Sequence, residues 1–325
     1  MTRAIWVVGE LVDGGLARIS GEVATAGRGL GDTAGRDVVG IVVGASPEAA
    51  AAELARFVPR VLAVDDPAAA TNAWSTVAAT RLAALVERET PSYVLVGATP
   101  DGRDLAGVLS ALLGWGVLAN ASALAWSDGG PTVEMSIFGG RLFTTSAFTS
   151  DRGIVTIRPN TVTAAPAASV GHVEAADAGA APVLPRVPVL ERVVEAGTAA
   201  PIEEAKVIVA GGRGVGGAEG FGIVQELADA LGGVVGATRA AVDAGWIGYA
   251  RQIGQTGKIV KPSLYVALGV SGAIQHKVGM QTAETIVAVN RDPDAPLAEF
   301  ADLYVVGDLF EVVPAVLAEL RTRDS

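Results

Sequence analysis

Short runs of Val and Ile, separated by Ala-rich segments, recur along the first half of this 325-residue chain and constrain its fold most strongly. The runs cover residues 5–8, 38–43, 61–64 and 93–96, and each is continuously apolar. Continuous apolar strands are typical of a parallel sheet that is buried on both faces. Residues 46–58 and 68–88 have the Ala content and the spacing of helices. The pattern therefore predicts an α/β fold with a doubly wound parallel sheet.

A second alternation of strands and helices follows a proline-rich segment. Residues 163–201 contain Pro166, Pro182, Pro185, Pro188 and Pro201 among Ala and Gly, a composition that disfavours helix and suits an extended connection. Beyond it, we predict strands at 206–210, 264–268, 285–290 and 303–306, and helices at 221–231 and 309–321. We also expect 133–138, 141–148 and 154–158 to be late strands of the first sheet.

These patterns predict two doubly wound parallel-sheet domains, the second of them a ligand-binding domain. The first is an N-terminal α/β domain over 1–195, which includes the proline-rich linker at about 163–200. The second covers 201–325. We expect the linker to act as a semi-rigid hinge that lets the second domain swing as a body.

Composition excludes several classes of function. The absence of Cys rules out disulfides, iron–sulfur clusters and a catalytic thiolate. The only two histidines, His172 and His276, lie far apart in the sequence, which argues against a zinc site or a hydrolytic triad. With a net charge of -11, the chain repels nucleic acid and anionic lipid. We therefore expect no metal, no catalytic residues and no nucleic-acid partner.

Mean hydropathy is high, at +0.43, and the stretch from Leu105 to Ser127 carries no charge. That stretch is long enough to span a bilayer, but it contains several glycines and lacks a flanking basic cluster. It therefore predicts a buried helix, a Gly turn and a strand. The apolar run near the N-terminus is too short for a signal peptide. We expect a cytoplasmic protein that does not span a membrane.

Three motifs in the second half could carry chemistry. Gly212–Gly217 fits G-x-G-x-x-G, which suits either a phosphate or a plain tight turn. Gly254–Lys258 reads GQTGK, but it is not a phosphate loop, because Gln252 stands where that motif has Gly and Ile259 where it has Ser or Thr. The loop could present an amide and a hydroxyl to a heteroaromatic ligand, or it could be a surface turn.

The third motif, Ser271–His276, follows a predicted strand, where open α/β sheets collect ligands. His276 could contribute to such a site or have a hydrogen-bonded structural role. Between Lys206 and Arg291 there are eight basic and five acidic side chains, a balance of +3 in an otherwise acidic chain. This local excess of positive charge indicates an anionic ligand.

The stretches that point to a family read KVIVAGGRGVGG, ATRAAVDAGW, RQIGQTGKIVKPSLYVALGVSGAIQHKVGM and TIVAVNRDPDAPLAEFADLYVVGDLFEVVP and, in the first half, VLVGATPDGRDLAGVLSALLG. On these stretches the chain resembles the alpha subunit of electron transfer flavoproteins. The resemblance implies FAD in the C-terminal domain and a heterodimer with a beta subunit. It also implies a role as electron carrier and not as an enzyme, fed by primary dehydrogenases such as the acyl-CoA dehydrogenases of fatty acid β-oxidation, with a membrane quinone oxidoreductase as acceptor.

The family pattern also implies which residues contact the flavin. They are Arg213, Thr238, Arg239, Ile253, Gly254, Gln255, Thr256, Ser271, Gly272, Ala273, Ile274, Gln275, His276, Asn290, Asp308 and Leu309.

The resemblance places Arg239 over the isoalloxazine ring. A guanidinium there, with the His276 imidazole at the ring edge, would stabilise the negative charge of a reduced flavin. Thr256 would donate its hydroxyl to N5, with Gln255 beside it. We expect this rim of the second sheet to form a cationic cradle.

The remaining predicted residues serve the rest of FAD. Ser271 and its neighbouring amides would meet the pyrophosphate, and Asn290 and Asp308 suit the adenosine. Two departures from the family pattern are the loop GVGGAEGF, which is usually more polar, and RPNT at Arg158 to Thr161 in place of RPG.

Two other readings remain open from the sequence. One is a Rossmann-type NAD(P)-dependent oxidoreductase that uses GGRGVGG as its dinucleotide loop. Its fingerprint is incomplete, because no acidic residue lies about 20 positions further on to hold a ribose. The other is the alpha subunit of a bifurcating flavoprotein, with a second flavin in the beta chain.

Overall fold

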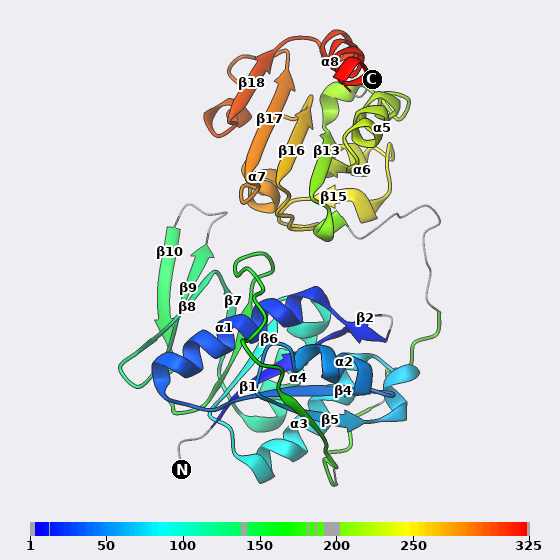
Figure 1. Cartoon of the computed structure of the whole chain (residues 1–325). Helices are drawn as coiled ribbons and strands as arrows, with labels where there is room; N and C mark the ends of the chain where they lie inside the picture. The colour runs from blue at the N-terminus through cyan, green and yellow to red at the C-terminus, as the bar shows by residue number, and fades with distance from the viewer. Residues whose placement is uncertain are drawn as a thin grey trace. The chain divides into compact units, whose positions relative to one another are not determined.

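A computed structural model of the chain describes residues 4–12, 14–137, 142–180, 182–185, 187–191 and 202–323. The chain divides into two compact units, Met1–Val193 and Val194–Ser325. Each unit is built on a parallel sheet with helices against its faces (Figure 1). The boundary predicted between 195 and 201 falls outside the described residues and stays a prediction.

The N-terminal sheet has seven strands in the order β12-β5-β4-β1-β6-β11-β7, and all their pairings are parallel. Their bounds are β1 Ile5–Gly9, β4 Val38–Gly44, β5 Arg60–Asp65, β6 Tyr93–Gly97, β7 Val117–Ala121, β11 Gly153–Ile157 and β12 His172–Ala175. Every residue of β1, β4 and β6 is buried. The predicted parallel sheet with two covered faces is confirmed.

Four helices cover this sheet. Helices α1 (Arg18–Ala34) and α2 (Glu48–Leu54) pack on one face, and α3 (Trp74–Glu89) and α4 (Pro100–Leu113) pack on the other. Helix α1 was not predicted, because its glycines lower helix propensity. The structure gives those glycines a packing role: a Cβ at Gly27 would lie 2.5 Å from Val7, and one at Gly31 would lie 2.4 Å from Val38.

The uncharged stretch from Leu105 to Ser127 forms the end of α4, a turn and two strands. Thr99 caps α4 by accepting a hydrogen bond from the Gly102 N–H (2.9 Å), and Gly114, at φ 66°, ends the helix in the left-handed conformation. The predicted helix, Gly turn and strand are confirmed. In the described part of the chain, no helix is long and apolar enough to cross a membrane.

The prediction for 133–138 and 141–148 is wrong. β8 (Ala123–Ser127), β9 (Gly130–Ile137) and β10 (Leu142–Ala147) form a separate antiparallel sheet. The reason is the two-residue turn between β8 and β9, where Asp128 and Gly129 both have positive φ (50° and 83°). Such a turn matches the twist of a hairpin and returns the chain antiparallel. Residues 138 and 141 lie outside the described residues, whereas the run at 154–158 does supply β11.

The proline-rich segment is extended, as expected, but most of it is bound to the N-terminal unit. Strand β12 pairs with β5, and the Arg60 guanidinium donates to the Glu174 carboxylate at 2.8 Å. Further on, the Ala73 N–H donates to the Val187 carbonyl at 2.8 Å. The expectation that the whole of 163–201 acts as a hinge is therefore wrong for the part up to residue 189. Residues 192–201 lie outside the described residues.

The C-terminal sheet has six parallel strands in the order β15-β14-β13-β16-β17-β18. Their bounds are β13 Val207–Gly211, β14 Val234–Thr238, β15 Gln252–Ile253, β16 Leu264–Leu268, β17 Thr285–Asn290 and β18 Leu303–Val306. The chain reverses its direction of travel across the sheet between β13 and β16. This switch point is where open α/β sheets bind ligands.

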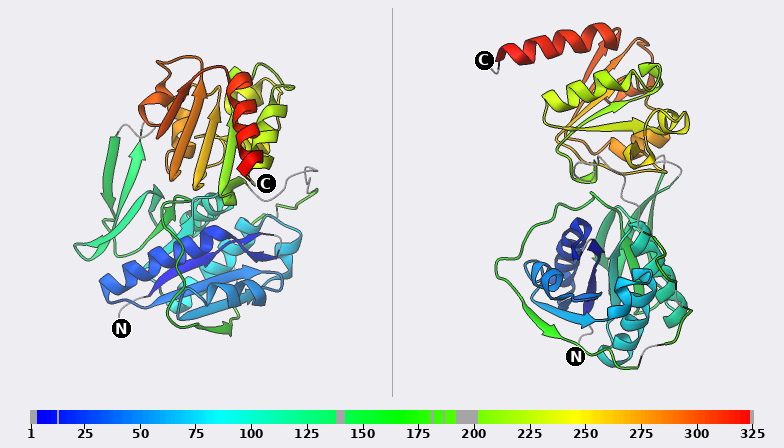
Figure 2. Two further views of the ribbon diagram at one scale, coloured as in Figure 1. Left: turned by 45° about the horizontal axis from the view of Figure 1, so that its top comes forward. Right: turned by 90° about the vertical axis from the view of Figure 1, so that its right-hand side faces the viewer.

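Helices lie on both faces of this second sheet. α5 (Phe221–Ala230) and α8 (Leu309–Arg323) pack on one side and α7 (Ile274–Met280) packs on the other, as the right-hand view of Figure 2 shows. β14, β15, α7 and the short α6 (Arg239–Asp243) were not predicted, because glycines interrupt or flank their apolar runs.

Candidate cofactor site

A cavity of about 730 Å³ opens at the carboxyl ends of β13, β14, β16 and β17. Four loops, the short helix α6 (Arg239–Asp243) and the start of α7 line it, and all belong to the C-terminal unit. The lining residues are Arg213, Gly214, Thr238, Arg239, Ala240, Asp243, Ile253, Gly254, Gln255, Thr256, Gly269, Val270, Ser271, Gly272, Ala273, Gln275, His276, Asn290, Asp292 and Ala295.

The structure brings together every predicted site residue except Ile274, Asp308 and Leu309. The sequence reasoning missed the lining residues Gly214, Ala240, Asp243, Gly269, Val270, Asp292 and Ala295. Gly269 and Val270 could have been found from their position directly after a strand. Asp243 could not, because it reaches the cavity only through α6.

Glycines let two loops cross closely at the switch point. The Gly214 N–H donates to the Gly269 carbonyl at 3.0 Å. A Cβ at Gly212 would lie 2.4 Å from the Gly269 oxygen, and one at Gly214 would lie 2.6 Å from the Gly269 Cα. The G-x-G-x-x-G glycines therefore allow backbone to pack on backbone, which keeps side chains out of the cavity mouth.

The GQTGK loop is anchored to its surroundings. The Gln255 N–H donates to the Gln275 carbonyl (2.7 Å), and Gly254 has a φ of 141° that favours glycine. The buried Gln252 amide donates to Thr256 Oγ1 at 3.1 Å. Because that oxygen already accepts a hydrogen bond, the Thr256 hydroxyl can donate its own proton toward the cavity.

Two observations test whether a cofactor fits this cavity. Among the described residues, Thr238 Oγ1 is the only buried side-chain nitrogen or oxygen without a hydrogen-bond partner. Within the same part of the chain, the backbone N–H groups of Ser271, Gly272 and Ala273 donate to no protein acceptor. Buried polar groups are normally paired, and consecutive free N–H groups are an anion-binding arrangement. The residues present therefore fit a ligand with polar and anionic groups.

Charges in the lining differ from the sequence expectation. Arg239 Nε pairs with Asp243 Oδ2 at 3.1 Å, whereas Arg213 is exposed and has no ion pair within the described residues. With Asp292, the lining holds two arginines and two aspartates. The excess of positive charge counted along 206–291 is therefore not concentrated in the cavity.

His276 lines the cavity, but both of its ring nitrogens have partners in the protein. Nε2 lies 2.9 Å from the Tyr265 hydroxyl and Nδ1 lies 3.0 Å from the Ile253 carbonyl oxygen. Burial lowers the pKa of His276 to about 4, and the hydrogen bond to Ile253 opposes this only in part. The imidazole is neutral at pH 7. Of the positive charge expected in the cationic cradle, only the two guanidinium groups remain, and the two aspartates of the lining balance them.

The three predicted residues outside the lining lie at the starts of α7 and α8. Ile274 begins α7 and is 36% exposed, whereas the Leu309 side chain is buried in the core beneath α8. Asp308 pairs with Arg291 and accepts a hydrogen bond from the Phe310 N–H at 3.0 Å. These hydrogen bonds hold the pKa of Asp308 below its ordinary value. A role for these residues toward the cofactor stays a prediction.

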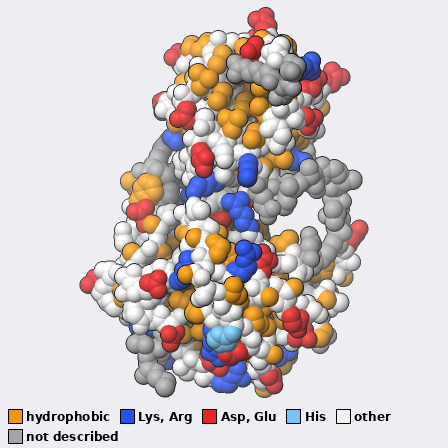
Figure 3. Space-filling view, viewed as in Figure 1, with side chains coloured by type: hydrophobic (Ala, Val, Ile, Leu, Met, Phe, Trp, Pro, Cys, Tyr) orange, Lys and Arg blue, Asp and Glu red, His pale blue; other side chains and the backbone are white. Residues whose placement is uncertain are grey.

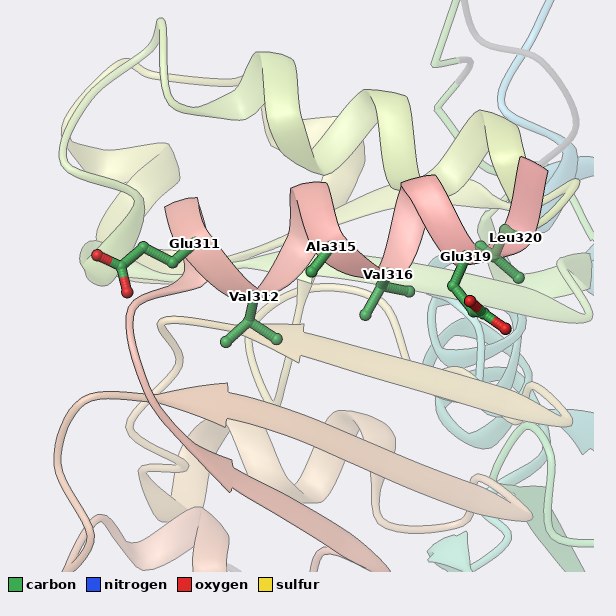
Figure 4. Close-up of a pocket in the computed structure, with 6 residues that line it drawn as sticks. All are labelled: Glu311, Val312, Ala315, Val316, Glu319 and Leu320. Atoms are coloured by element: carbon green, nitrogen blue, oxygen red, sulfur yellow. The ribbon is translucent and has the colours of Figure 1, made fainter. Parts of the chain in front are cut away.

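A second hollow, of about 610 Å³, lies beside α8 and is lined by Glu311, Val312, Ala315, Val316, Glu319 and Leu320. Figure 4 shows Val312 and Val316 on the side of α8 that faces away from α5. Its lining is apolar apart from two carboxylates. It therefore does not suit an anionic cofactor, and none of the predicted site residues lies there.

Comparison with known proteins bears on both units. Residues 5–189 match the family model described as electron transfer flavoprotein domain, and residues 201–281 match the electron transfer flavoprotein FAD-binding domain. The chain is 39% identical to a protein of Thermoanaerobacterium thermosaccharolyticum, with 98% of each chain covered. It is 38% identical to one of Bacillus subtilis (99% of this chain, 98% of that one) and 43% identical to one of Mycobacterium tuberculosis (98% of each). All three are named electron transfer flavoprotein subunit alpha.

Proposed function

We propose, from the premise that this chain belongs to the electron transfer flavoprotein subunit alpha family, that it is the FAD-bearing half of a heterodimer with a beta subunit. Membership of the family makes it an electron-transfer protein with an FAD-binding domain, not a catalytic enzyme. In our proposal it accepts electrons from primary dehydrogenases, such as acyl-CoA dehydrogenases of fatty acid β-oxidation. It then passes them to a membrane quinone oxidoreductase.

The observation that carries this proposal is the cavity at the switch point, with its unpartnered Thr238 hydroxyl and free amides. FAD, when bound, supplies a ring that takes up and releases electrons. In our proposal the N–H groups of Ser271, Gly272 and Ala273 bind its pyrophosphate, and Asn290 lies on the adenosine side. The Thr238 hydroxyl gains the partner that it lacks in the protein.

Two side chains would act toward the flavin ring. Arg239 carries a guanidinium cation, which favours negative charge on a nearby ring. The Thr256 hydroxyl, oriented by Gln252, donates a hydrogen bond. His276 is neutral and contributes shape and polarity but no charge.

An exposed apolar surface on the C-terminal unit supports the proposed partner subunit. Leu303 is 55% exposed, Val306 57% and Phe310 44%, all on or beside β18 and α8. Figure 3 shows hydrophobic side chains gathered on the surface of this unit. Large exposed apolar side chains on one unit are what a protein interface would cover.

The nicotinamide alternative lacks a residue that it needs. A ribose-binding carboxylate stands at the end of the second strand of such folds. Here β14 ends in Thr238 and is followed by Arg239, and the nearby Asp243 is paired with that arginine. The bifurcating alternative concerns a flavin in the beta chain and is decided by stoichiometry.

A visible spectrum of the chain purified with its beta subunit tests the proposal. We expect a yellow complex with one FAD per heterodimer, reduced by an acyl-CoA dehydrogenase with its substrate and reoxidised by a quinone oxidoreductase. Two flavins per heterodimer would favour a bifurcating protein. A colourless pair that binds a nicotinamide would contradict the proposal.

A further inference from the structure

We propose that Tyr265 is a positioning residue for the cofactor loop: it holds His276 as the Nδ1-protonated tautomer, and His276 in turn holds the Ile253 carbonyl. The cofactor loop is the cavity-lining segment at residues 253–256. The proposal rests on the proposed function only in that this segment is taken to contact a cofactor. It starts from a buried chain of hydrogen bonds. Tyr265 in β16 is fully buried and His276 in α7 is 6% exposed.

The tautomer follows from the partners of the two ring nitrogens. A carbonyl oxygen only accepts, so the Ile253 carbonyl requires a proton on Nδ1. Within the described residues, the Tyr265 hydroxyl has His276 Nε2 as its only hydrogen-bond partner. A buried phenol must donate its proton, so Nε2 is the acceptor and carries no proton. A charged imidazole would leave the phenol proton without an acceptor.

The surroundings agree with a neutral ring. The ring's polar partners in the described structure are a phenol and a backbone carbonyl, and no carboxylate contacts it. The neighbouring Lys277 places its Nζ over the Phe300 ring, 4.4 Å from the centroid. The fixed tautomer therefore does not depend on an ion pair.

The chain of hydrogen bonds ends at the loop that lines the cavity. Ile253 is the last residue of β15, and Gly254, Gln255 and Thr256 follow it directly. α7 and this loop touch backbone to backbone, since a Cβ at Gly279 would lie 2.3 Å from the Gly254 nitrogen. Removing the Tyr265 hydroxyl frees Nε2 to take a proton. The hydrogen bond to Ile253 is then the one remaining restraint on the tautomer that the described structure shows, so a fraction of the rings can turn or change tautomer, and in that fraction the Ile253 carbonyl loses its donor.

The test uses ¹⁵N-histidine NMR on the full-length chain in complex with its beta subunit. His172→Asn leaves His276 as the only histidine of this chain, because the sequence has two. We expect His276 to show only the Nδ1-protonated form from pH 6 to pH 8. Tyr265→Phe should yield a mixture that includes the Nε2-protonated form and speed FAD release about fivefold, the effect of losing one hydrogen bond.

Tyr249→Phe is the matched control, because Tyr249 donates to the Thr256 carbonyl at 2.8 Å but does not contact His276. It should leave the tautomer unchanged. His276→Asn keeps a donor for the Ile253 carbonyl and should retain FAD better than His276→Leu. This pair of variants tests whether the hydrogen bond to Ile253 holds the loop, even if Tyr265→Phe does not fold.

Three results would overturn the proposal: a wild-type His276 protonated at Nε2, a Tyr265→Phe variant with the wild-type tautomer, or equal FAD release from the Asn and Leu variants. The tautomer is read whether or not flavin is bound. A colourless complex would therefore contradict the proposed function but would leave the tautomer of His276 to be read as before.

Discussion

The carboxyl-end rims of the two sheets start from similar topology and end differently. In the N-terminal unit, β1, β4 and β6 each end in a glycine, and a hydrophobic side chain fills the space beside it. Cβ atoms there would lie 3.0 Å from Leu16 at Gly9, 2.2 Å from Leu11 at Gly44 and 2.6 Å from Ile19 at Gly97. In the C-terminal unit β13 also ends in a glycine, Gly211, beside which Phe221 fills the space, but the loop beyond it packs Gly214 against the backbone of Gly269 and the cavity stays open.

The polar groups at the two rims differ in whether other groups of the protein pair with them. In the N-terminal unit the Thr99 hydroxyl donates to Glu10 Oε2 at 2.6 Å, and the Asn160 N–H donates to Glu22 Oε2 at 2.7 Å. In the C-terminal unit the Thr238 hydroxyl has no partner among the residues that the structure describes. The two rims therefore differ both in the space that their loops leave and in the hydrogen-bond donors that stay unpaired within the described residues.

We expect the largest change in stability from a substitution that adds a side chain where backbone packs on backbone at the C-terminal rim. Gly214→Ala places a Cβ against backbone that cannot move away, so we expect a loss of about 3 kcal/mol in the free energy of unfolding and loss of FAD. Gly217→Ala is the control in the same loop, because its Cβ would meet nothing within 4 Å. Denaturant unfolding of the two variants measures the difference. Equal stability would break the idea of a backbone-packed rim.

The filled N-terminal rim should respond to pH. Burial raises the pKa of Glu10 to about 7, with a smaller contribution from Asp101 and an opposing one from the Thr99 hydrogen bond. The folded state therefore holds a proton that the unfolded state releases. This stabilisation is complete below about pH 4.5 and is lost as pH rises through about 7.

Glu10→Gln removes that cost of ionisation. At pH 8 it should raise the free energy of unfolding by up to about 3 kcal/mol over wild type, and near pH 4.5 it should change little. The exposed Glu53→Gln is the control and should have little effect at either pH. A Glu10→Gln gain that is the same at both pH values would show that the Glu10 carboxylate is not destabilised by burial.

Thr238→Val tests the difference between the hydrogen-bonded polar groups of the N-terminal rim and the unpaired hydroxyl of the C-terminal rim. Because the hydroxyl has no partner in the described part of the chain, its replacement by a methyl group should stabilise the FAD-free complex by about 1 kcal/mol. The same change should speed FAD release about tenfold. Unfolding of the FAD-free form and release from the loaded form measure the two effects. Faster release together with lower stability would indicate a packing defect instead of a lost ligand contact.

The smallest effect concerns the charge at the open rim. Arg239→Ala should lower the potential of the bound flavin by about 50 mV, close to a tenfold change for a one-electron couple, because a positive charge near the reduced ring is lost. Arg239→Lys keeps the charge and should shift the potential less. A potentiometric titration compares them. An unchanged potential in the Ala variant would remove Arg239 from this role.

Local patterns predicted the strands of both sheets well where apolar residues run without interruption, as in β1, β16 and β17, and also at β4, where Val and Ile continue on both sides of Gly40. They failed at β14, a short run that Gly232 and Gly233 precede and Gly236 interrupts, and at α1, whose glycines face the sheet. Residue types marked the G-x-G-x-x-G and GQTGK loops as candidate ligand loops but left a plain turn open for each, and the structure places residues of both loops in the lining of one cavity. The charge of His276 could not be predicted, because Tyr265 and Ile253 reach it only through the pairing of strands and the placement of α7.

The amino-acid order by itself determined the layered α/β architecture and the residues available to hold a cofactor, since apolar continuity and glycine placement act over a few neighbouring positions. Only the tertiary structure decided which rim is filled and which is open, and which side chains keep a charge. Those properties depend on desolvation and hydrogen bonding between segments that are distant in the chain.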